Sequence, residues 1–371
     1  MKIIVAPDSF KGSLCARDAA RAMEKGIKKA DSSAQVIVLP VADGGEGTLD
    51  ALTDEKNRIM VKVTGPYGEK LDAQYGFDGE RAIIEMAQAA GLCLTEERHT
   101  ADATTYGVGE MIADAVGRGC TKITLTAGGS ATSDCGCGMM ASLGVKFFDK
   151  DGSSFIPTGR TLADVAGFDL SRFCADYGGC EFTIATDVKN PLCGDNGSVY
   201  VYSRQKGASD NELEIMENGM ANIARLVSEK CGRDIADIPG SGAAGGLPVF
   251  LLAFAAAKIR SGIDTVLEFT KFEDALDGGI DAVFIGEGKI DRQSLWGKAI
   301  SGVCSLCSKK NIPVDCLVGC VGDDRDELKS MGLRSISAIT DIAPDTASAM
   351  SGAADHLCEL AYRRTRELKG E

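Results

Sequence analysis

Residues 124–140 read TLTAGGSATSDCGCGMM, and this stretch guides the interpretation of the whole chain. An apolar, β-prone run at Lys122–Ala127 meets two glycines, then hydroxyl and acidic side chains, and then an apolar helical pattern from Met139. The stretch therefore predicts a strand, a tight turn and a helix N-terminus. Such a terminus suits an anion, because its backbone N–H groups lack intrahelical partners and its dipole favours negative charge. The alternative is a plain strand–helix connection whose glycines only shape the turn.

The composition is that of an ordinary globular protein. The chain has 371 residues, of which 44% are hydrophobic and 25% charged, and this length favours two domains. A net charge of -14 argues against binding to a nucleic acid or to an anionic membrane. It does not exclude a small anionic ligand, which responds to local charge. No apolar run reaches the ~18 residues of a membrane span.

The N-terminus and the cysteines favour a cytoplasmic protein. Met1 and Lys2 are followed at once by the apolar run Ile3–Ala6, which is typical of a first strand rather than of a signal peptide. The 14 cysteines are then expected to be reduced thiols. The pair Cys304 and Cys307 has no partner pair at zinc-like spacing, so we expect no zinc site. With only two histidines, acid–base and metal chemistry must fall to Asp, Glu and Lys.

Strands followed by polar loops and helices occur at both ends of the chain. The expected strands are Lys2–Ala6, Gln35–Leu39, Ala282–Ile285, Val314–Val318 and Ser335–Ile339. This alternation predicts one parallel sheet built from both ends. Between them, Asn57–Glu85 alternates apolar and polar residues and predicts antiparallel strands. We expect an α/β protein: a discontinuous Rossmann- or flavodoxin-like parallel-sheet domain, residues 1–65 and 280–371, with a second α/β domain inserted at 66–279.

Five loops that follow predicted strands carry charged or hydroxyl side chains beside glycines. They contain Asp8 and Lys11; Asp43 and Glu46; Ser130, Thr132 and Asp134; Asp187, Lys189 and Asn190; and Glu287, Lys289, Asp291, Arg292 and Lys298. Ligands of parallel sheets bind beyond the carboxyl ends of the strands, where these loops lie. Phosphoryl transfer from a magnesium nucleotide requires this mixture, because carboxylates hold Mg²⁺ and orient a hydroxyl while cations and N–H groups stabilise the phosphoryl charge.

Each loop also has a purely structural interpretation. Asp8, Ser130 and Thr132 are suited to capping helices, and Asp43 to forming an Asx-turn. Glu46 suits a helix N-terminus, and Lys298 an exposed surface. The chain also lacks a G-x-x-x-x-G-K-[ST] phosphate-binding loop. The occurrence of five such loops in one chain favours the functional interpretation.

At these loops the chain resembles the bacterial glycerate kinase family, the type I enzymes of glyoxylate and sugar-acid metabolism. The matching segments run in order from Ala6 to Ala299: APDSFKGSL, ADGGEGT, TTYGVGE, GGSATSDCGCGM, ATDVKNPLCG, QKGA, PGSGAAGGL and GEGKIDRQSLWGKA. Cys135 and Cys137 depart from the glycine or alanine usual in the family, and Ser133 from a frequent asparagine. The resemblance implies ATP- and Mg²⁺-dependent phosphorylation of D-glycerate, at the 2-hydroxyl in most bacterial members, and an active-site cleft between the two domains.

On this resemblance we assign roles to the loop residues. The nucleotide phosphates are expected at Gly128, Gly129, Ser130, Thr132, Asp134, Gly242, Gly245 and Gly246. The expected catalytic residues are Asp187, Lys11, Asp43, Lys289 and Asp291. The expected substrate-binding residues are Asp8, Ser9, Lys11, Arg292 and Lys298, and the expected ligands of Mg²⁺ are Asp187 and Glu287. The spacing does not distinguish the base from the metal ligand among these carboxylates.

Three functional alternatives stay open at this point. The enzyme could phosphorylate the 3-hydroxyl of D-glycerate, or it could act on another short hydroxy acid. A non-catalytic binding protein on the same fold is the third alternative, but loss of the acidic loop residues would be expected there, and all the candidates are present. The expected partner is a small-molecule substrate, and a homodimer is compatible with the sequence.

Overall fold

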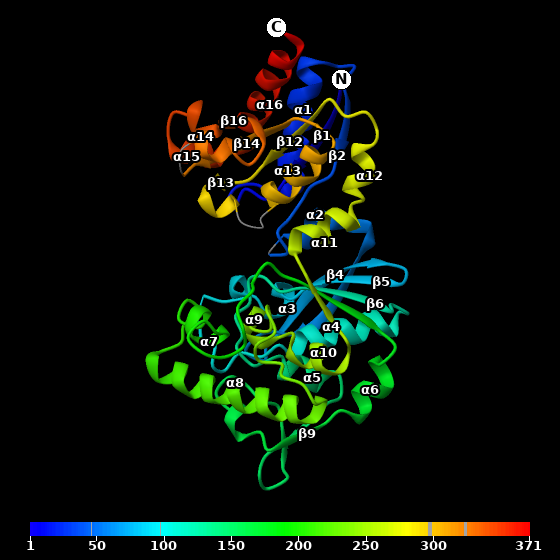
Figure 1. Cartoon of the computed structure of the whole chain (residues 1–371), viewed down its shortest axis with the longest axis vertical. Helices are drawn as coiled ribbons and strands as arrows, with labels where there is room; N and C mark the ends of the chain where they lie inside the picture. The colour runs from blue at the N-terminus through cyan, green and yellow to red at the C-terminus, as the bar shows by residue number, and fades with distance from the viewer. Residues whose placement is uncertain (46, 97, 296–298, 323–324) are drawn as a thin grey trace. The chain divides into compact units, whose positions relative to one another are not determined.

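The computed structural model (Figure 1) describes residues 1–371 except 46, 97, 296–298 and 323–324. The chain forms two compact units, one of residues 1–43, 50–52 and 261–371 and the other of residues 44–49 and 53–260. These boundaries between the units differ from those expected from the sequence, which lie between residues 65 and 66 and between residues 279 and 280. The difference arises because β3 (Arg58–Thr64) belongs to the sheet of the second unit, whereas α11 (Gly262–Phe269) packs into the core of the first.

The first unit is built on the parallel sheet that the sequence predicts. Its strands are β1 (Lys2–Pro7), β2 (Gln35–Val38), β12 (Ala282–Gly286), β14 (Val314–Val318) and β16 (Leu333–Ala338). Their spatial order is β16-β14-β12-β1-β2, and every pairing is parallel. In chain order this is 2-1-3-4-5, the flavodoxin-like arrangement. The prediction of an α/β fold with a parallel sheet is therefore confirmed.

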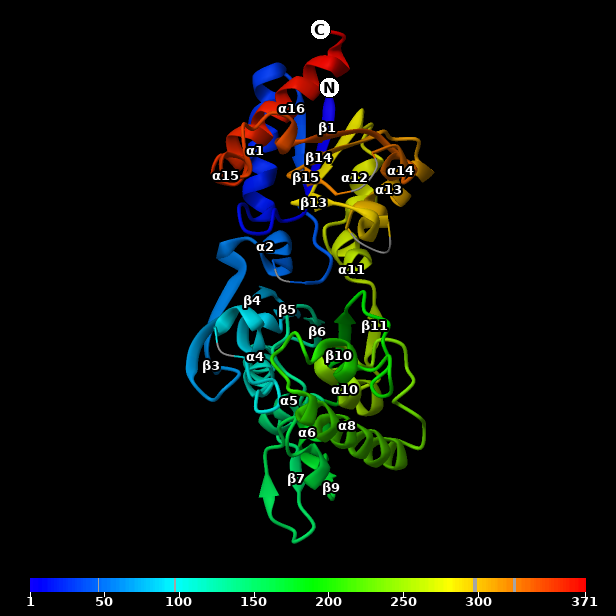
Figure 2. The same ribbon diagram turned by 90° about the vertical axis from the view of Figure 1, so that its left-hand side faces the viewer.

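Helices cover both faces of this sheet, as Figure 2 shows. Along β1, Ile3 and Val5 point to one face while Ile4 and Ala6 point to the other, and all four are fully buried. One face packs against α1 (Ala16–Ala30), α15 (Thr346–Ser351) and α16 (Ala353–Lys369). The other packs against α11, α12 (Phe272–Leu276), α13 (Ala299–Lys309) and α14 (Arg325–Lys329). The last helical segment consists of two helices, α15 and α16, because the chain leaves helical geometry at Gly352.

The second unit has a six-stranded mixed sheet. Its order is β11 (Lys258–Arg260), β10 (Glu181–Ala185), β6 (Lys122–Thr126), β5 (Arg81–Glu85), β4 (Lys70–Asp78) and β3. The predicted antiparallel segment is confirmed, because β3 pairs with β4 and β4 with β5 in antiparallel fashion. The strands from β5 to β11 are parallel. Their carboxyl ends therefore meet at one edge of the sheet.

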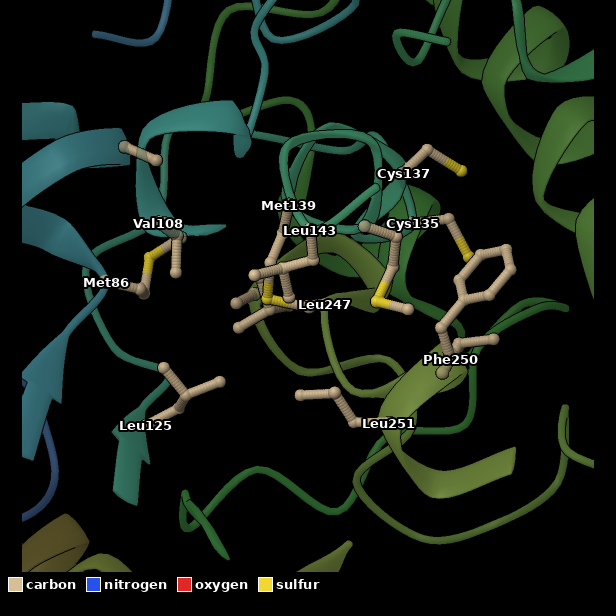
Figure 3. Close-up of a cluster of buried hydrophobic side chains, with 14 of the residues drawn as sticks. Met86, Val108, Leu125, Cys135, Cys137, Met139, Leu143, Leu247, Phe250 and Leu251 are labelled. Carbon is tan, nitrogen blue, oxygen red and sulfur yellow. The ribbon is translucent and has the colours of Figure 1, made fainter. Parts of the chain in front are cut away.

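Eight described helices and a small sheet complete the second unit. The helices are α3 (Ala87–Ala90), α4 (Tyr106–Gly117), α5 (Cys137–Ser142), α6 (Ser171–Tyr177), α7 (Ser198–Tyr202), α8 (Asp210–Cys231), α9 (Ala243–Gly246) and α10 (Val249–Phe254). The small antiparallel sheet consists of β7 (Lys146–Phe148), β8 (Ser154–Phe155) and β9 (Gly167–Asp169). Figure 3 shows Leu125 of β6, Met139 of α5, Leu143 at its C-terminal end, and Leu247 and Phe250, all of which belong to the core of this unit.

The remaining elements are short. They are α2 (Thr48–Leu52), β13 (Lys289–Ile290), β15 (Cys320–Val321) and the 3-10 turns Glu55–Asn57, Leu92–Leu94, Leu162–Asp164, Arg292–Leu295 and Ile339–Asp341. Among the helices of the described residues, none has the length and apolar character needed to cross a membrane.

A buried ionic cluster joins the last elements of the first unit. Asp315 on β14 is fully buried. Its carboxylate accepts hydrogen bonds from Arg334 Nε at 3.0 Å and Ser335 Oγ at 2.7 Å, both on β16, and pairs with Arg364 of α16 at 3.0 Å. Removing one member of a buried ion pair leaves the other charges without compensation. Asp315 therefore links two strands to the terminal helix.

We expect Asp315→Asn to destabilise the protein by about 3 kcal/mol, because two arginines would then face a neutral amide. The measurement is the urea midpoint followed by circular dichroism. Arg363→Ala is the control, since Arg363 lies on α16 next to Arg364 but forms an exposed ion pair with Glu359. Such exposed pairs contribute ~1 kcal/mol or less to the free energy of unfolding. Equal midpoints for Asp315→Asn and the control would contradict the assigned role.

Candidate active site

A pocket of about 430 Å³ lies in the first unit at the carboxyl ends of β1 and β12. It is lined by Asp8, Ser9, Phe10, Lys11, Ser13, Asp43, Glu287, Gly288, Lys289, Asp291, Gly319, Cys320, Ile339, Thr340, Thr346, Ala349, Met350 and Ala353. After β1 the chain enters α1 on one face of the sheet, and after β12 it continues to α13 on the other. The two neighbouring strands thus continue to opposite faces of the sheet, which makes this edge a topological switch point. Ligands of doubly wound sheets bind at such points.

One end of the pocket is charged. Asp8 directly follows β1, Glu287 directly follows β12, and Asp43 lies in the segment after β2. The register of the two central strands brings the first two together, because Pro7 pairs with Gly286 and the Asp8 N–H donates to Gly286 O at 2.8 Å. The structure thus gathers the residues predicted after three different strands.

The environment of Asp8 disfavours its charged form. Burial raises the pKa of the Asp8 carboxyl to about 7, and the negative charges of Asp43 and Glu287 act in the same direction. The Ser9 N–H and the charge of Lys11 oppose this shift. A carboxyl group with a pKa near neutrality is suited to accepting and releasing a proton.

The loop after β12 is held in place by the loop after β14. The N–H groups of Gly319 and Cys320 donate to Glu287 O and Gly288 O, each at 3.0 Å. The backbones approach so closely that a Cβ on Gly319 would lie 2.3 Å from Gly288 O. Ser294 Oγ also donates to Glu287 Oε1 at 2.6 Å. These contacts fix the direction of the Glu287 carboxylate.

Lys289 and Asp291, both predicted to be catalytic, line the pocket and pair at 3.4 Å. Arg292 does not line it. Its guanidinium instead donates to Glu327 Oε2 of α14 at 3.2 and 2.9 Å. The assignment of Arg292 to substrate binding is therefore not supported by its position. Lys298 and Glu46 lie outside the described residues.

The rest of the pocket lining is mostly apolar, and none of these residues was predicted from the sequence to have a role. It is formed by Phe10, Cys320, Ile339, Thr340, Thr346, Ala349, Met350 and Ala353. Several come from the segment between β16 and α16, which has no glycine-rich or charged motif after its strand. Only the fold reveals that this segment reaches the pocket.

In the second unit, the Gly128–Asp134 loop follows β6 as predicted. Gly128 approaches the backbone of Gly45 so closely that a Cβ would lie 2.4 Å from its Cα, and Gly129 has a φ of +72°. Gly129 is exposed, whereas Ser130 is 6% exposed and Thr132 fully buried. Both glycines are thus required by the backbone of this turn.

Asp134 has a different role from the predicted one. It is fully buried, and its carboxylate accepts hydrogen bonds from the N–H groups of Thr105, Gly136 and Gly138 and from Thr105 Oγ1, at 2.7–3.1 Å. Burial raises the pKa of Asp134 while these donors oppose the shift. The N–H groups at the start of α5 are thus occupied by an internal carboxylate. This corrects the prediction that Asp134 and an open helix terminus face a nucleotide.

The predicted glycine loop at 242–246 packs against the same turn. A Cβ on Gly245, whose φ is +71°, would lie 2.1 Å from Thr132 O. A Cβ on Gly242 would lie 2.2 Å from Pro191 O, and one on Gly246 would lie 2.8 Å from Leu192 Cδ1. All three glycines are buried. In this structure they allow close packing of the loops rather than presenting N–H groups to a ligand.

The predicted metal ligands belong to different units. Asp187 is exposed just after β10 in the second unit, and Glu287 lines the pocket of the first. Among the described residues, no group of three or more His, Cys, Asp or Glu side chains is arranged to hold a metal ion. This does not disfavour Mg²⁺, which proteins usually bind through one or two carboxylates and the substrate phosphates.

Lys206 is a notable residue to which the sequence analysis assigned no role. It belongs to the QKGA segment and is 4% exposed. Its Nζ donates to Ser130 Oγ and to Thr132 O, both at 2.8 Å. Burial lowers the pKa of Lys206 to about 7, although the charge of Asp134 opposes the shift.

Comparisons with known proteins agree on one family. The sequence profile described as "Glycerate kinase family" matches residues 3–369. The chain is 39% identical over 337 residues to glycerate kinase of Halalkalibacterium halodurans, covering 89% of this chain and 88% of that protein. It is 38% identical over 367 residues to glycerate 2-kinase of Escherichia coli K12, covering 97% and 96%. The crystal structure of a Salmonella typhimurium LT2 protein assigned as glycerate kinase 2 matches with a TM-score of 0.89 and 34% identity, covering 100% and 98%.

The environment of Asp8 predicts a pH-dependent stability. An unfolded Asp8 titrates near 3.9, whereas in the folded protein its pKa is about 7. The folded state therefore binds more protons between these values, and its stability falls as the pH rises from about 4 to about 7. We expect Asp8→Asn to remove this loss and to be on the order of 2 kcal/mol more stable than the native protein at pH 8.

The measurement is the difference in urea midpoint between the two proteins at pH 5 and pH 8, which should be larger at pH 8. Asp326→Asn, at an exposed site on α14, should give the same small difference at both pH values. An Asp8→Asn protein that is less stable than the native one at pH 8 would contradict the analysis.

Proposed function

The chain belongs to the glycerate kinase family, and we propose that it transfers the terminal phosphoryl group of ATP to the 2-hydroxyl of D-glycerate, giving 2-phospho-D-glycerate and ADP. The observation that carries this proposal is the charged end of the pocket, where Asp8 lies among other carboxylates and lysines at the switch point of the sheet. The name of the Escherichia coli relative, glycerate 2-kinase, supports the choice of the 2-hydroxyl.

The chemistry of D-glycerate matches that end of the pocket. The substrate has one carboxylate, which Lys11 and Lys289 are suited to bind. It has two hydroxyl groups, and the attacking one must lose a proton during transfer. Asp8 is our candidate for the group that accepts this proton, because its raised pKa matches the working range of a general base. This revises the earlier assignment, in which Asp8 only bound the substrate.

Carboxylate oxygens beside Asp8 suit a magnesium ion that arrives with the nucleotide. Glu287 and Asp43 both line the pocket, and hard oxygen ligands are what Mg²⁺ prefers. Bound there, the ion would neutralise charge on the phosphate oxygens. Asp187 remains a candidate from the second unit, since it is exposed at the end of β10.

The nucleotide phosphates are assigned to the turn at Gly128–Ser130. In the described structure, the N–H groups of Gly128 and Gly129 donate no hydrogen bond to a protein acceptor. N–H groups in a turn with a left-handed glycine commonly form an anion-binding concavity. The assignment therefore retains Gly128, Gly129 and Ser130 and leaves out Asp134 and the buried glycines at 242–246.

We expect ATP-dependent phosphorylation of D-glycerate to require Mg²⁺ and the Asp8 carboxylate. Asp8→Asn should lower kcat by about 10²–10⁴-fold, the usual contribution of a general base, with a smaller change in KM. For the native enzyme kcat/KM should rise with pH up to about 7, because the base must be deprotonated, and the rise should be absent in Asp8→Asn. Asp326→Asn serves as the control with native activity. A fully active Asp8→Asn would exclude this residue as the base.

The position of phosphorylation can be read from a coupled assay with enolase, pyruvate kinase and lactate dehydrogenase. We expect a signal without added phosphoglycerate mutase, because 2-phosphoglycerate is the substrate of enolase. A signal only after adding mutase would show that the 3-hydroxyl is the acceptor. The absence of any signal from folded protein would overturn D-glycerate as the substrate, and a panel of short hydroxy acids would then identify the acceptor.

A further inference from the structure

The turn that carries Lys206 is built to hold this residue inside the second unit. It connects α7 with α8, and Gly207 adopts a φ of +93°. A Cβ on Gly207 would lie 2.2 Å from Arg98 O, so a larger residue does not fit. Arg98 Nη1 also donates to Gln205 O at 3.0 Å. Contacts with Arg98 therefore hold the outer side of the turn, and the Lys206 side chain points into the interior of the second unit.

Three hydrogen bonds join this turn to the Gly128–Asp134 loop. Lys206 Nζ reaches Ser130 Oγ and Thr132 O, as described above. Ser203 Oγ lies 3.1 Å from Ser133 Oγ, and Thr100 Oγ1 donates to Ser133 Oγ at 3.1 Å. All of these side chains are buried. The QKGA segment thus supports the loop from inside the protein.

Among the described residues, Lys206 has no direct counter-ion. No carboxylate of that part of the chain lies within 4 Å of its Nζ, and the nearby Asp134 uses its oxygens on other donors. A buried cation without an ion pair is costly. The same loop also keeps Thr132 Oγ1 buried without a hydrogen-bond partner among the described residues. Unsatisfied polar groups of this kind often mark functional sites.

Ser130, whose hydroxyl contacts Lys206, directly follows the exposed Gly129. In its protonated form, which a bound anion favours, Lys206 only donates hydrogen bonds, so Ser130 Oγ is the acceptor. The proton of Ser130 itself then has no acceptor among the described residues. Ser130 is 6% exposed, and an anion bound at Gly129 would lie one residue away from this hydroxyl.

We propose that Lys206 is a positioning residue, which holds the Gly128–Ser130 turn and directs the Ser130 hydroxyl proton toward a phosphate group of the nucleotide. This inference rests on the proposed function for the identity of the anion. In the complex with the nucleotide, the phosphate group would supply the negative charge that the buried Lys206 ammonium lacks. This role would also explain why the QKGA segment contains a lysine at a site surrounded by protein.

The test compares Lys206→Met, Ser130→Ala and the double variant with Arg204→Met, a control on the same turn in an exposed pair with Asp210. The probe is MgADP, titrated by calorimetry, together with steady-state kinetics. We expect Lys206→Met and Ser130→Ala each to raise the Kd for MgADP and the KM for ATP at least tenfold, with the KM for D-glycerate changed less than twofold. The double variant should bind MgADP with a Kd no higher than that of the weaker-binding single variant, because the two residues act as one unit.

Further outcomes separate this proposal from a general loss of structure. Ser130→Thr, which keeps the hydroxyl, should bind MgADP within threefold of the native protein. Ser130→Ala leaves Lys206 in place and tests the proposal even if Lys206→Met does not fold. Native affinity for MgADP in Lys206→Met or Ser130→Ala would overturn the proposal. Equal increases in the KM for ATP and in the KM for D-glycerate would overturn it as well. If the native protein binds MgADP but does not phosphorylate D-glycerate, the proposed substrate fails and the titration still tests Lys206. A native protein that binds no nucleotide would overturn both.

Discussion

The parallel pairing of β1 with β12 is the contact on which the first unit depends. It joins residues 2–7 to residues 282–286, across the whole second unit in sequence. Its register sets Pro7 beside Gly286, so the next residues, Asp8 and Glu287, emerge together at the carboxyl edge. Two carboxylates held this way disfavour each other's charge, which contributes to the raised pKa of Asp8. One strand pairing thus sets both the topology and the electrostatics of the pocket.

Much of the fold follows from local patterns that are visible in the sequence. Both ends of the chain show short apolar runs followed by polar loops, and these runs form the five parallel strands. The alternation at residues 57–85 also gives antiparallel strands. The boundaries between the units were harder to predict from the sequence. β3 joins the second sheet by pairing with β4, and the sequence of β3 alone does not specify this partner.

The candidate site was predictable only in part. The sequence places Asp8, Asp43 and Glu287 after strands, and parallel topology brings such residues to one edge. Whether a polar group faces a ligand or the protein interior depends on tertiary contacts that spacing does not encode. Asp134 illustrates this limit, because the same position after a glycine turn suits an anion site and an internal helix cap. The structure selects the cap.

The glycines of the second unit bear on how a chain of net charge -14 could accommodate the anionic nucleotide that we propose. Gly245 allows the 242–246 loop to lie directly on the backbone of Thr132, which closes the inner side of the turn to solvent. A cation enclosed there is poorly screened, so its interaction with an anion above the turn is stronger than that of a surface lysine. The position of Lys206 therefore depends on tight packing of glycine loops. On the proposal that this turn binds a phosphate group, local burial rather than net charge would determine how strongly it does so.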